Sequence, residues 1–333
     1  MRLLLTGSTG FVGRNLLLRL LQAKKYDEIW LPVRSPEKLR EQLVGEGYLD
    51  LPSSVKVVKT EAPDWDLSQI PSVEDVVHAA ATLSGTNREE YFKVNKDGTR
   101  RLLEQLPRSA RILILSSLAA AGPCPRGVQQ REESHESFPV TWYGESKLAM
   151  EEMLAKDFAD RPYLCLRPPM VLGPRDQASL PLFKMAKQPL RFKPGFRIKR
   201  YSYIAVGDLV SAILSALKKD WSALPQRIFF VGSDEPVTDA DLINESARAL
   251  NKTGLTLSIP HPIIWGVSRV VDQVPAWRKA IPNLSADRAR EIWPQSWVAS
   301  AEPFKKNFDW TPTQNFSDLL KETGDWYRAS RQL

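Results

Sequence analysis

The sequence predicts an α/β fold in which a doubly wound parallel sheet is joined to a smaller, interleaved C-terminal lobe. Short runs rich in leucine and β-branched residues alternate with helical patterns through the first half of the chain, which is typical of repeated strand–helix–strand units. A glycine-rich turn follows the first of these runs. The chain has 333 residues, more than one compact core usually holds, so a second lobe is expected.

The composition excludes several classes of protein. Hydrophobic residues make up 43% of the chain and charged residues 26%, proportions that exclude a disordered or rod-like chain. Two cysteines and three widely spaced histidines exclude a disulfide scaffold and predict no metal site. No apolar run approaches ~20 residues, and the N-terminus shows no signal sequence, so we expect a cytoplasmic protein without a transmembrane segment.

The elements follow in order from periodicity and turn residues. Strands of the sheet are predicted at residues 2–6, 28–33, 55–59, 75–78, 111–115, 163–167 and 227–231. Helical spacing of apolar residues predicts helices at 11–22, 87–106, 142–158, 208–218 and 316–327. A capping-box pattern at Thr238 and Asp241 opens a further helix that runs to about Leu250.

Proline spacing divides the chain. Six prolines between 168 and 194 predict an irregular region, whereas the helix at 208–218 and the strand after it return to the sheet. Residues 1–170, with 204–234, are therefore assigned to the first lobe. Residues 171–203 and 235–333 are assigned to the second.

The turn after the first strand is suited to a phosphate group. Gly7, Gly10 and Gly13 lie between a strand and a helix, where glycine lets the backbone approach a pyrophosphate and the helix N-terminus offers N–H groups. The residues predicted to hold a dinucleotide here are Gly7, Ser8, Thr9, Gly10, Phe11 and Val12.

The spacing G-x-x-G-x-x-G resembles that of extended short-chain dehydrogenases/reductases, a superfamily with a Rossmann-type fold. Residues 76–80, Val-Val-His-Ala-Ala, resemble the family's strand end beside the adenine, and residues 95–99 match its N-x-x-G-T segment. Asn95 is expected to support the backbone of the site. The resemblance implies cofactor contacts at His78, Ala79, Ala80, Tyr143, Lys147 and Pro168.

The end of the second strand indicates which nicotinamide cofactor is bound. NAD-specific sites place a carboxylate there for the ribose hydroxyl, but this chain has Arg34, followed by Lys38. A guanidinium suits a 2′-phosphate, so NADP is expected, with NAD possible if Arg34 is merely solvated and Glu37 binds the ribose.

The resemblance also implies a catalytic triad. Tyr143 and Lys147 lie one helical turn apart, and a neighbouring ammonium is expected to lower the pKa of the phenol. Ser117 precedes Gly122 by the family's five positions and is expected to bind the substrate oxygen, with Ser116 as the alternative. Hydride would pass to or from the nicotinamide while Tyr143 exchanges a proton with that oxygen.

The second lobe departs from the pattern of the family's nucleotide-sugar enzymes. Met170 stands where they carry an asparagine, and Arg200 is one place from their phosphate-binding arginine. Both residues, with Ser117 and Trp265, are predicted to contact a fairly apolar substrate. Trp265 lies in the apolar stretch 260–282, which is interpreted as a lid, as core, or as a membrane-surface helix.

Together these features predict an NAD(P)-dependent oxidoreductase acting on an alcohol or ketone. The alternatives are a nucleotide-sugar epimerase or dehydratase and a non-catalytic NADP sensor. Partners are expected to be a small-molecule substrate and a second copy in a homodimer, with neither nucleic acid nor peripheral membrane contact. The formal charge of +7 comes from residues 183–200, which carry seven basic and no acidic side chains; this segment is interpreted as a solvated loop or a site for an anionic apolar ligand.

Overall fold

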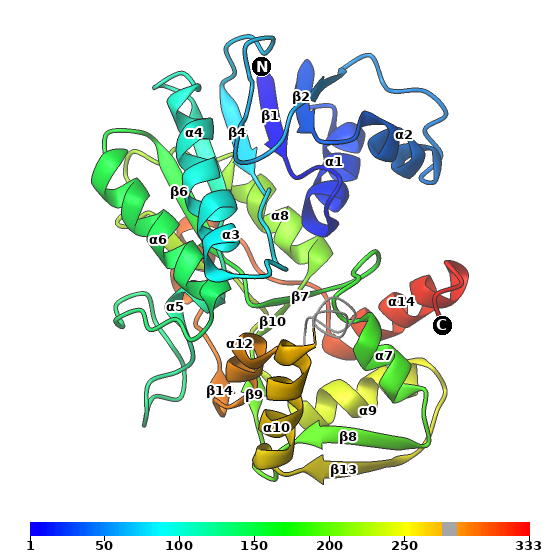
Figure 1. Ribbon diagram of the computed structural model, residues 1–333. Helices are drawn as coiled ribbons and strands as arrows, with labels where there is room; N and C mark the ends of the chain where they lie inside the picture. The colour runs from blue at the N-terminus through cyan, green and yellow to red at the C-terminus, as the bar shows by residue number, and fades with distance from the viewer. Residues whose placement is uncertain (275–284) are drawn as a thin grey trace.

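Seven strands pair side by side into one parallel sheet at the N-terminal end of the molecule (Figure 1). The computed structural model describes residues 1–274 and 285–333. The strands lie in the order β11-β6-β5-β4-β1-β2-β3. The chain adds β2 and β3 on one side of β1 and the later strands on the other side, as in doubly wound folds. Their bounds are Arg2–Thr6 (β1), Glu28–Val33 (β2), Val55–Lys59 (β3), Asp75–His78 (β4), Arg111–Leu115 (β5), Tyr163–Arg167 (β6) and Ile228–Phe230 (β11).

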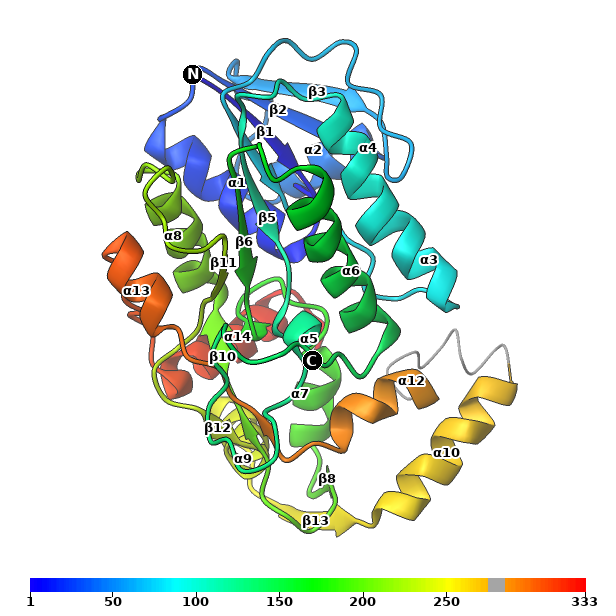
Figure 2. The ribbon, with the colours of Figure 1, turned by 90° about the vertical axis from the view of Figure 1, so that its left-hand side faces the viewer.

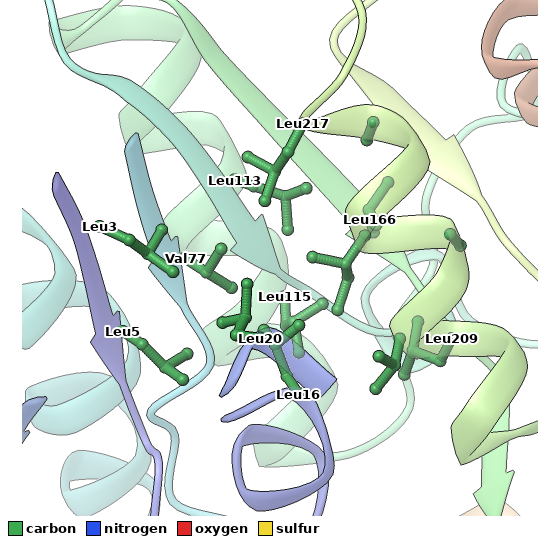
Figure 3. Packing of buried hydrophobic residues seen from close by; sticks show 14 of the residues in the cluster. Leu3, Leu5, Leu16, Leu20, Val77, Leu113, Leu115, Leu166, Leu209 and Leu217 are labelled. Carbon is green, nitrogen blue, oxygen red and sulfur yellow. The ribbon is translucent and has the colours of Figure 1, made fainter. Parts of the chain in front are cut away.

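Helices cover both faces of this sheet, as Figure 2 shows. Leucines of α1 (Phe11–Ala23) and α8 (Val206–Ala216) pack against the strands on one face, and Figure 3 shows this leucine-rich core. On the other face lie α4 (Gly98–Glu104) and α6 (Trp142–Asp157). Because both faces are covered, the strands are apolar throughout instead of alternating. The predicted α/β fold is confirmed.

Two further helices contribute to the first core. Leu39 and Leu43 of α2 (Pro36–Val44) are buried in it, as expected for a helix between two strands of the sheet. Phe304 and Phe308 of α13 (Glu302–Phe308) are buried in the same cluster. This part of the chain lies in the segment assigned to the second lobe, so the packing crosses the predicted boundary.

The helix expected at 87–106 is interrupted. It consists of α3 (Arg88–Phe92), a π-helical turn η1 (Lys93–Asp97) and α4. A π-helical turn inserts an extra residue into the helical repeat and often lies at a functional site. Here it contains Asn95.

The proline-rich region expected to be irregular contains two strands and a helix: β7 (Met170–Leu172), α7 (Leu180–Ala186) and β8 (Leu190–Pro194). The strand β9 (Arg200–Tyr201) follows it. The prolines lie at the starts and ends of these elements, where a missing N–H costs little. The prediction was wrong because proline spacing marks element boundaries as well as loops.

The remaining elements complete the second lobe. The predicted capping box is present at Thr238 and Asp241, and the strand β10 that pairs with β7 leads into α8. The bounds are β10 (Tyr203–Ala205), β12 (Val237–Thr238), α9 (Asp239–Ala249), β13 (Leu255–Ile259), α10 (His261–Gln273), α12 (Ala286–Ala289), η3 (Arg290–Ile292), β14 (Ser296–Trp297) and α14 (Phe316–Ala329), with the short α5 (Leu118–Ala121) following β5. Within the described ranges, no helix is long and apolar enough to cross a membrane.

Candidate functional site

The glycine turn between β1 and α1 is tightly packed against the end of β4. Gly7 has a φ of +72°, and a Cβ there would lie 2.7 Å from the carbonyl carbon of Ala79. A Cβ on Gly13 would lie 2.1 Å from the Gly7 oxygen. Only glycine fits at these two positions, so the turn brings bare backbone to the carboxyl edge of the sheet.

The chemistry of this turn fits a dinucleotide. The first turn of α1 has no side-chain cap and no acidic residue, which leaves its N–H groups free for a phosphate. The Ser8 hydroxyl is buried and has no hydrogen-bond partner among the described residues. An uncapped helix N-terminus beside an unpaired buried hydroxyl is suited to the pyrophosphate of a nicotinamide dinucleotide.

His78 braces the edge of the sheet. Its Nδ1 lies 2.8 Å from the Thr6 hydroxyl and its Nε2 lies 2.9 Å from the Thr99 hydroxyl. Burial, with a smaller effect of the Lys147 charge, lowers the pKa of His78 to about 3. Both ring nitrogens are already hydrogen-bonded, so only the main chain of His78 is left for a polar contact with the cofactor. Thr6, which also accepts a hydrogen bond from the Ala80 N–H, was not predicted.

Tyr143 and Ser117 lie side by side at the carboxyl edge of the sheet. Thr141 caps α6, so Tyr143 lies in the first turn of that helix, and Ser117 caps α5 and accepts the Ala119 N–H at 3.1 Å. Burial raises the pKa of Tyr143 to about 12, although the neighbouring Ser117 hydroxyl and the charge of Arg288 act in the opposite direction. Lys147 is not among the groups that lower it, so the predicted lowering by that ammonium is corrected.

Lys147 is buried one turn beyond Tyr143. Its Nζ donates to the carbonyl oxygen of Leu115, at the end of β5, at 2.8 Å. Burial lowers its pKa to about 8, partly offset by Cys165 and Glu151. The three residues expected to form the triad are therefore brought together by β5, α5 and α6 at the carboxyl edge of the sheet.

A third segment, far along the chain, covers Tyr143. The Arg288 guanidinium in α12 lies 5.6 Å from the centre of the Tyr143 ring, and Asp287 accepts the N–H of Trp142 at 3.2 Å. Glu291 accepts a hydrogen bond from Thr141 at 3.0 Å. Sequence reasoning missed these contacts, because nearly 150 residues separate the partners and no spacing marks them.

A buried ion pair lies behind the triad. Arg167 Nε and Nη2 bind the two oxygens of Glu151 at 3.0 and 2.5 Å, and both side chains are almost fully buried. Ser116, just after β5, donates to the same carboxylate at 2.5 Å. Ser117 is therefore the serine that lies beside Tyr143. The signal available in the sequence was the position of Glu151, one turn beyond Lys147 on the same helix.

Asn95, in the π-helical turn, ties α6 to the strand edge. Its Nδ2 donates to the Ser146 hydroxyl at 2.9 Å and its Oδ1 accepts the Thr82 N–H at 2.8 Å. Because Ser146 precedes Lys147, this contact fixes the helix that carries Tyr143 and Lys147. Asn95 supports the backbone of the site, as expected.

The end of β2 presents exposed cations. Arg34 is exposed, with its Nε 3.7 Å from Glu61. Lys38 is exposed on α2, where its N–H is capped by Ser35. Glu37 accepts a hydrogen bond from the Ser35 hydroxyl. Pro168 is buried at the end of β6, and its carbonyl accepts the Leu118 N–H at 2.9 Å.

The other predicted substrate residues lie in the second lobe. Met170 is half-buried in the strand pair β7–β10, packed against the lobe's core, and Arg200 is exposed at the start of β9. Trp265 lines a pocket of about 340 Å³ with His261, Pro262 and Trp293. No triad residue lines that pocket, so the structure does not join Trp265 to the triad.

Known proteins resemble this chain along its whole length. It is 25% identical to ceramide reductase from Caulobacter vibrioides, over 99% of this chain and 95% of that protein. It is 28% identical to UDP-glucose 4-epimerase from Vibrio cholerae, over 96% and 94%. Sterol-4-alpha-carboxylate 3-dehydrogenase, decarboxylating, from Candida albicans is 26% identical over 97% of this chain and 96% of its own length.

Solved structures share the fold. UDP-glucuronic acid 4-epimerase from Bacillus cereus, in complex with UDP-glucuronic acid and NAD, superposes with a TM-score of 0.76 at 20% identity, covering 99% of this chain and all of that one. The sequence profile of the NAD dependent epimerase/dehydratase family matches residues 3–232, which hold the glycine turn, Ser117, Tyr143 and Lys147. The chain belongs to the NAD dependent epimerase/dehydratase family.

Proposed function

We propose that this protein is an NADP-dependent oxidoreductase that transfers hydride between the nicotinamide and an alcohol or ketone of a fairly apolar substrate. The observation that carries the proposal is the placement of Ser117 beside Tyr143, one turn before the buried Lys147. This arrangement lies at the same sheet edge as the glycine turn.

In this proposal each residue has one task. The bound nicotinamide supplies or accepts the hydride at its C4. Ser117 hydrogen-bonds the substrate oxygen, and Tyr143 gives that oxygen a proton during reduction or takes one during oxidation. Burial keeps Tyr143 protonated at neutral pH, which is the form that reduction needs. Arg288 supplies positive charge near the phenol as it loses its proton.

The glycine turn would hold the dinucleotide. Residues 7–12 offer N–H groups and the Ser8 hydroxyl to the pyrophosphate, and Ala79 and Ala80 leave room beside the adenine. Tyr143, Lys147 and the buried Pro168 would border the nicotinamide half.

An apolar substrate is supported by the second lobe and by two relatives. Met170 offers no polar contact to a sugar hydroxyl, and its neighbours belong to an apolar cluster. Ceramide reductase and sterol-4-alpha-carboxylate 3-dehydrogenase are named for lipid substrates. Residues 171–203 and 235–333 are proposed to form most of the substrate lobe, and a homodimer stays a prediction.

The direct test follows NADPH absorbance with a panel of long-chain and steroid ketones, and NADP with the matching alcohols. We expect turnover with at least one apolar compound and none with UDP-sugars. If the purified protein binds NADPH but turns over no ketone or alcohol, the proposal fails.

An epimerase is the second candidate, because the Vibrio cholerae relative is UDP-glucose 4-epimerase. In that case the cofactor would be reduced and reoxidised within one turnover. Incubation with UDP-glucose would then yield a second sugar stereoisomer without net consumption of NADPH. The same purified protein serves both tests.

The cofactor preference is tested at Arg34. Replacing it with alanine removes a charge-assisted contact to a 2′-phosphate, so the KM for NADPH is expected to rise about tenfold or more, while that for NADH changes little. Arg40→Ala is the matched control, because Arg40 is also an exposed arginine and lies on the nearby helix α2. Equal effects of Arg34→Ala on both cofactors would show that Arg34 does not read the phosphate.

A further inference from the structure

The two-stranded sheet of the second lobe has its polar and apolar faces reversed. β8 and β13 run parallel and pair Leu190 with Leu255 and Phe192 with Leu257. All four of these side chains are exposed. A sheet with one wet face normally buries its apolar side chains and exposes its polar ones.

The inward face of this sheet carries the charges. The charged residues of β8 alternate with its exposed apolar ones. Arg191 is 3% exposed and donates to the Gln188 carbonyl, and Lys193 pairs with Asp239 of α9 at 3.1 Å. The ion pair between Lys193 and Asp239 therefore joins the strand to α9. Its apolar side chains contribute to no core of the described residues.

Neighbouring segments extend the same apolar surface. Phe196 and Ile198, in the turn after β8, are 73% and 67% exposed. Ile263, Val267 and Val270 are exposed along one side of α10, which follows β13 directly. We call the exposed apolar side chains of β8, of the 195–198 turn, of β13 and of α10 the apolar face. The strands β8 and β13 and the helix α10 lie at the end of the molecule farthest from the parallel sheet (Figures 1 and 2).

The apolar face gathers most of the large apolar side chains that are exposed in the described residues. It holds nine of the fourteen large apolar side chains that are exposed in the described part of the chain. Single exposed apolar residues are ordinary, but a contiguous group marks a surface that binds a partner.

The charge around the face identifies the partner. Residues 183–200 and 251–274 contain nine basic side chains and one acidic one, Asp272, and Lys187, Arg197, Lys252 and Arg269 are exposed there. A second copy docked through this face would bring two such groups of cations together, which is unfavourable. A bilayer with anionic lipids accepts apolar side chains and attracts cations.

We propose that the apolar face is a docking surface for an anionic membrane, with Phe196 and Ile198 inserted among the lipids. The sequence favoured no peripheral membrane contact, although a membrane-surface helix was one interpretation of residues 260–282, because the reversed sheet could not be recognised there. The proposal concerns location, and it does not depend on the reaction proposed above.

Vesicle flotation of the full chain tests it. Vesicles of phosphatidylcholine alone are compared with vesicles that also contain phosphatidylglycerol. We expect the protein to float with the anionic vesicles at low salt and to be released by high salt. Binding by the double variant Phe196→Ser, Ile198→Ser should fall at least about tenfold, and Arg197→Glu should also weaken it about tenfold.

Leu49→Ser is the matched control, because Leu49 is 84% exposed in the first lobe. It should float like the unaltered protein, and all variants should keep their melting temperature. The proposal is overturned if the unaltered protein floats with neither kind of vesicle, or if Leu49→Ser and the double variant lose binding equally. Self-association that the double variant abolishes, without flotation, would assign the face to a second copy instead.

Discussion

Two regions of this molecule place polar and apolar groups in opposite ways. At the carboxyl edge of the parallel sheet, His78, Lys147 and Glu151 are buried, and each has hydrogen-bond partners. In the apolar face, Phe192 and Leu257 are exposed while Lys193 of the same sheet is paired on the inner side.

The two arrangements indicate different roles for the two regions. Buried polar groups cost free energy unless they are paired, so their presence at the sheet edge indicates a site held in one geometry. Exposed apolar groups contribute little to folding, so their presence in the apolar face indicates contact with a partner. Substitutions at the first region should therefore change activity or stability, whereas those at the second should change neither.

The largest effect is expected at Tyr143. Phenylalanine removes the hydroxyl that exchanges a proton with the substrate, so kcat should fall by about 10³-fold, with the KM for NADPH nearly unchanged. Tyr48→Phe, at a half-buried position away from the triad, should keep full activity. Activity of Tyr143→Phe within about tenfold of the original would remove Tyr143 from the mechanism.

Breaking the buried ion pair should destabilise the region around the triad. Glu151→Gln leaves the Arg167 charge buried without its carboxylate, and such a loss costs about 3 kcal/mol or more. Urea unfolding measures it, with Glu152→Gln, an exposed neighbour on α6, as the control. Equal stabilities of the two variants would show that solvent reaches Arg167 and compensates the charge.

The two regions also differ in how far they could be predicted. The strands and helices around the triad follow from local patterns: an apolar run, a glycine turn and a Tyr-x-x-x-Lys spacing lie within a few residues of one another. Arg288 and Asp287 could not be predicted, because only the folded chain brings α12 to the start of α6.

The apolar face escaped prediction for a different reason. Alternation in β8 and β13 identifies which side chains share a face, but not which face is buried. That choice depends on α9, where Asp239 pairs with Lys193. Residues 183–200 therefore showed their charge in the sequence, while the packing of Phe183 in the core and the exposure of Phe192 and Phe196 required the structure.

His78 should make stability depend on pH. Its pKa is about 3 in the folded protein and about 6.5 in the unfolded chain, so below pH 6.5 only the unfolded state takes up this proton. Stability is therefore lost as the pH falls from 6.5 towards 3, by about 2 kcal/mol between pH 7 and pH 5.

Urea unfolding at pH 7 and pH 5 checks this effect. His78→Gln cannot titrate, so it should lose about 2 kcal/mol less than the original protein across that interval, whatever its stability at pH 7. The acidic groups that titrate nearby are common to both proteins and cancel in the difference. Identical losses would mean that the imidazole is protonated in the folded state.

The smallest effect on the free energy of unfolding is expected at Leu257. A small effect there is what the contrast between the two regions requires. Leu257→Ser on the apolar face removes a side chain that is 42% exposed, so the free energy of unfolding should change by less than about 0.5 kcal/mol. Leu113→Ala, in the fully buried core, should cost about 2–5 kcal/mol. Both are measured by urea unfolding without lipid. A loss at Leu257 close to that at Leu113 would show that β13 is part of a folding core, and the contrast between the two regions would then no longer hold.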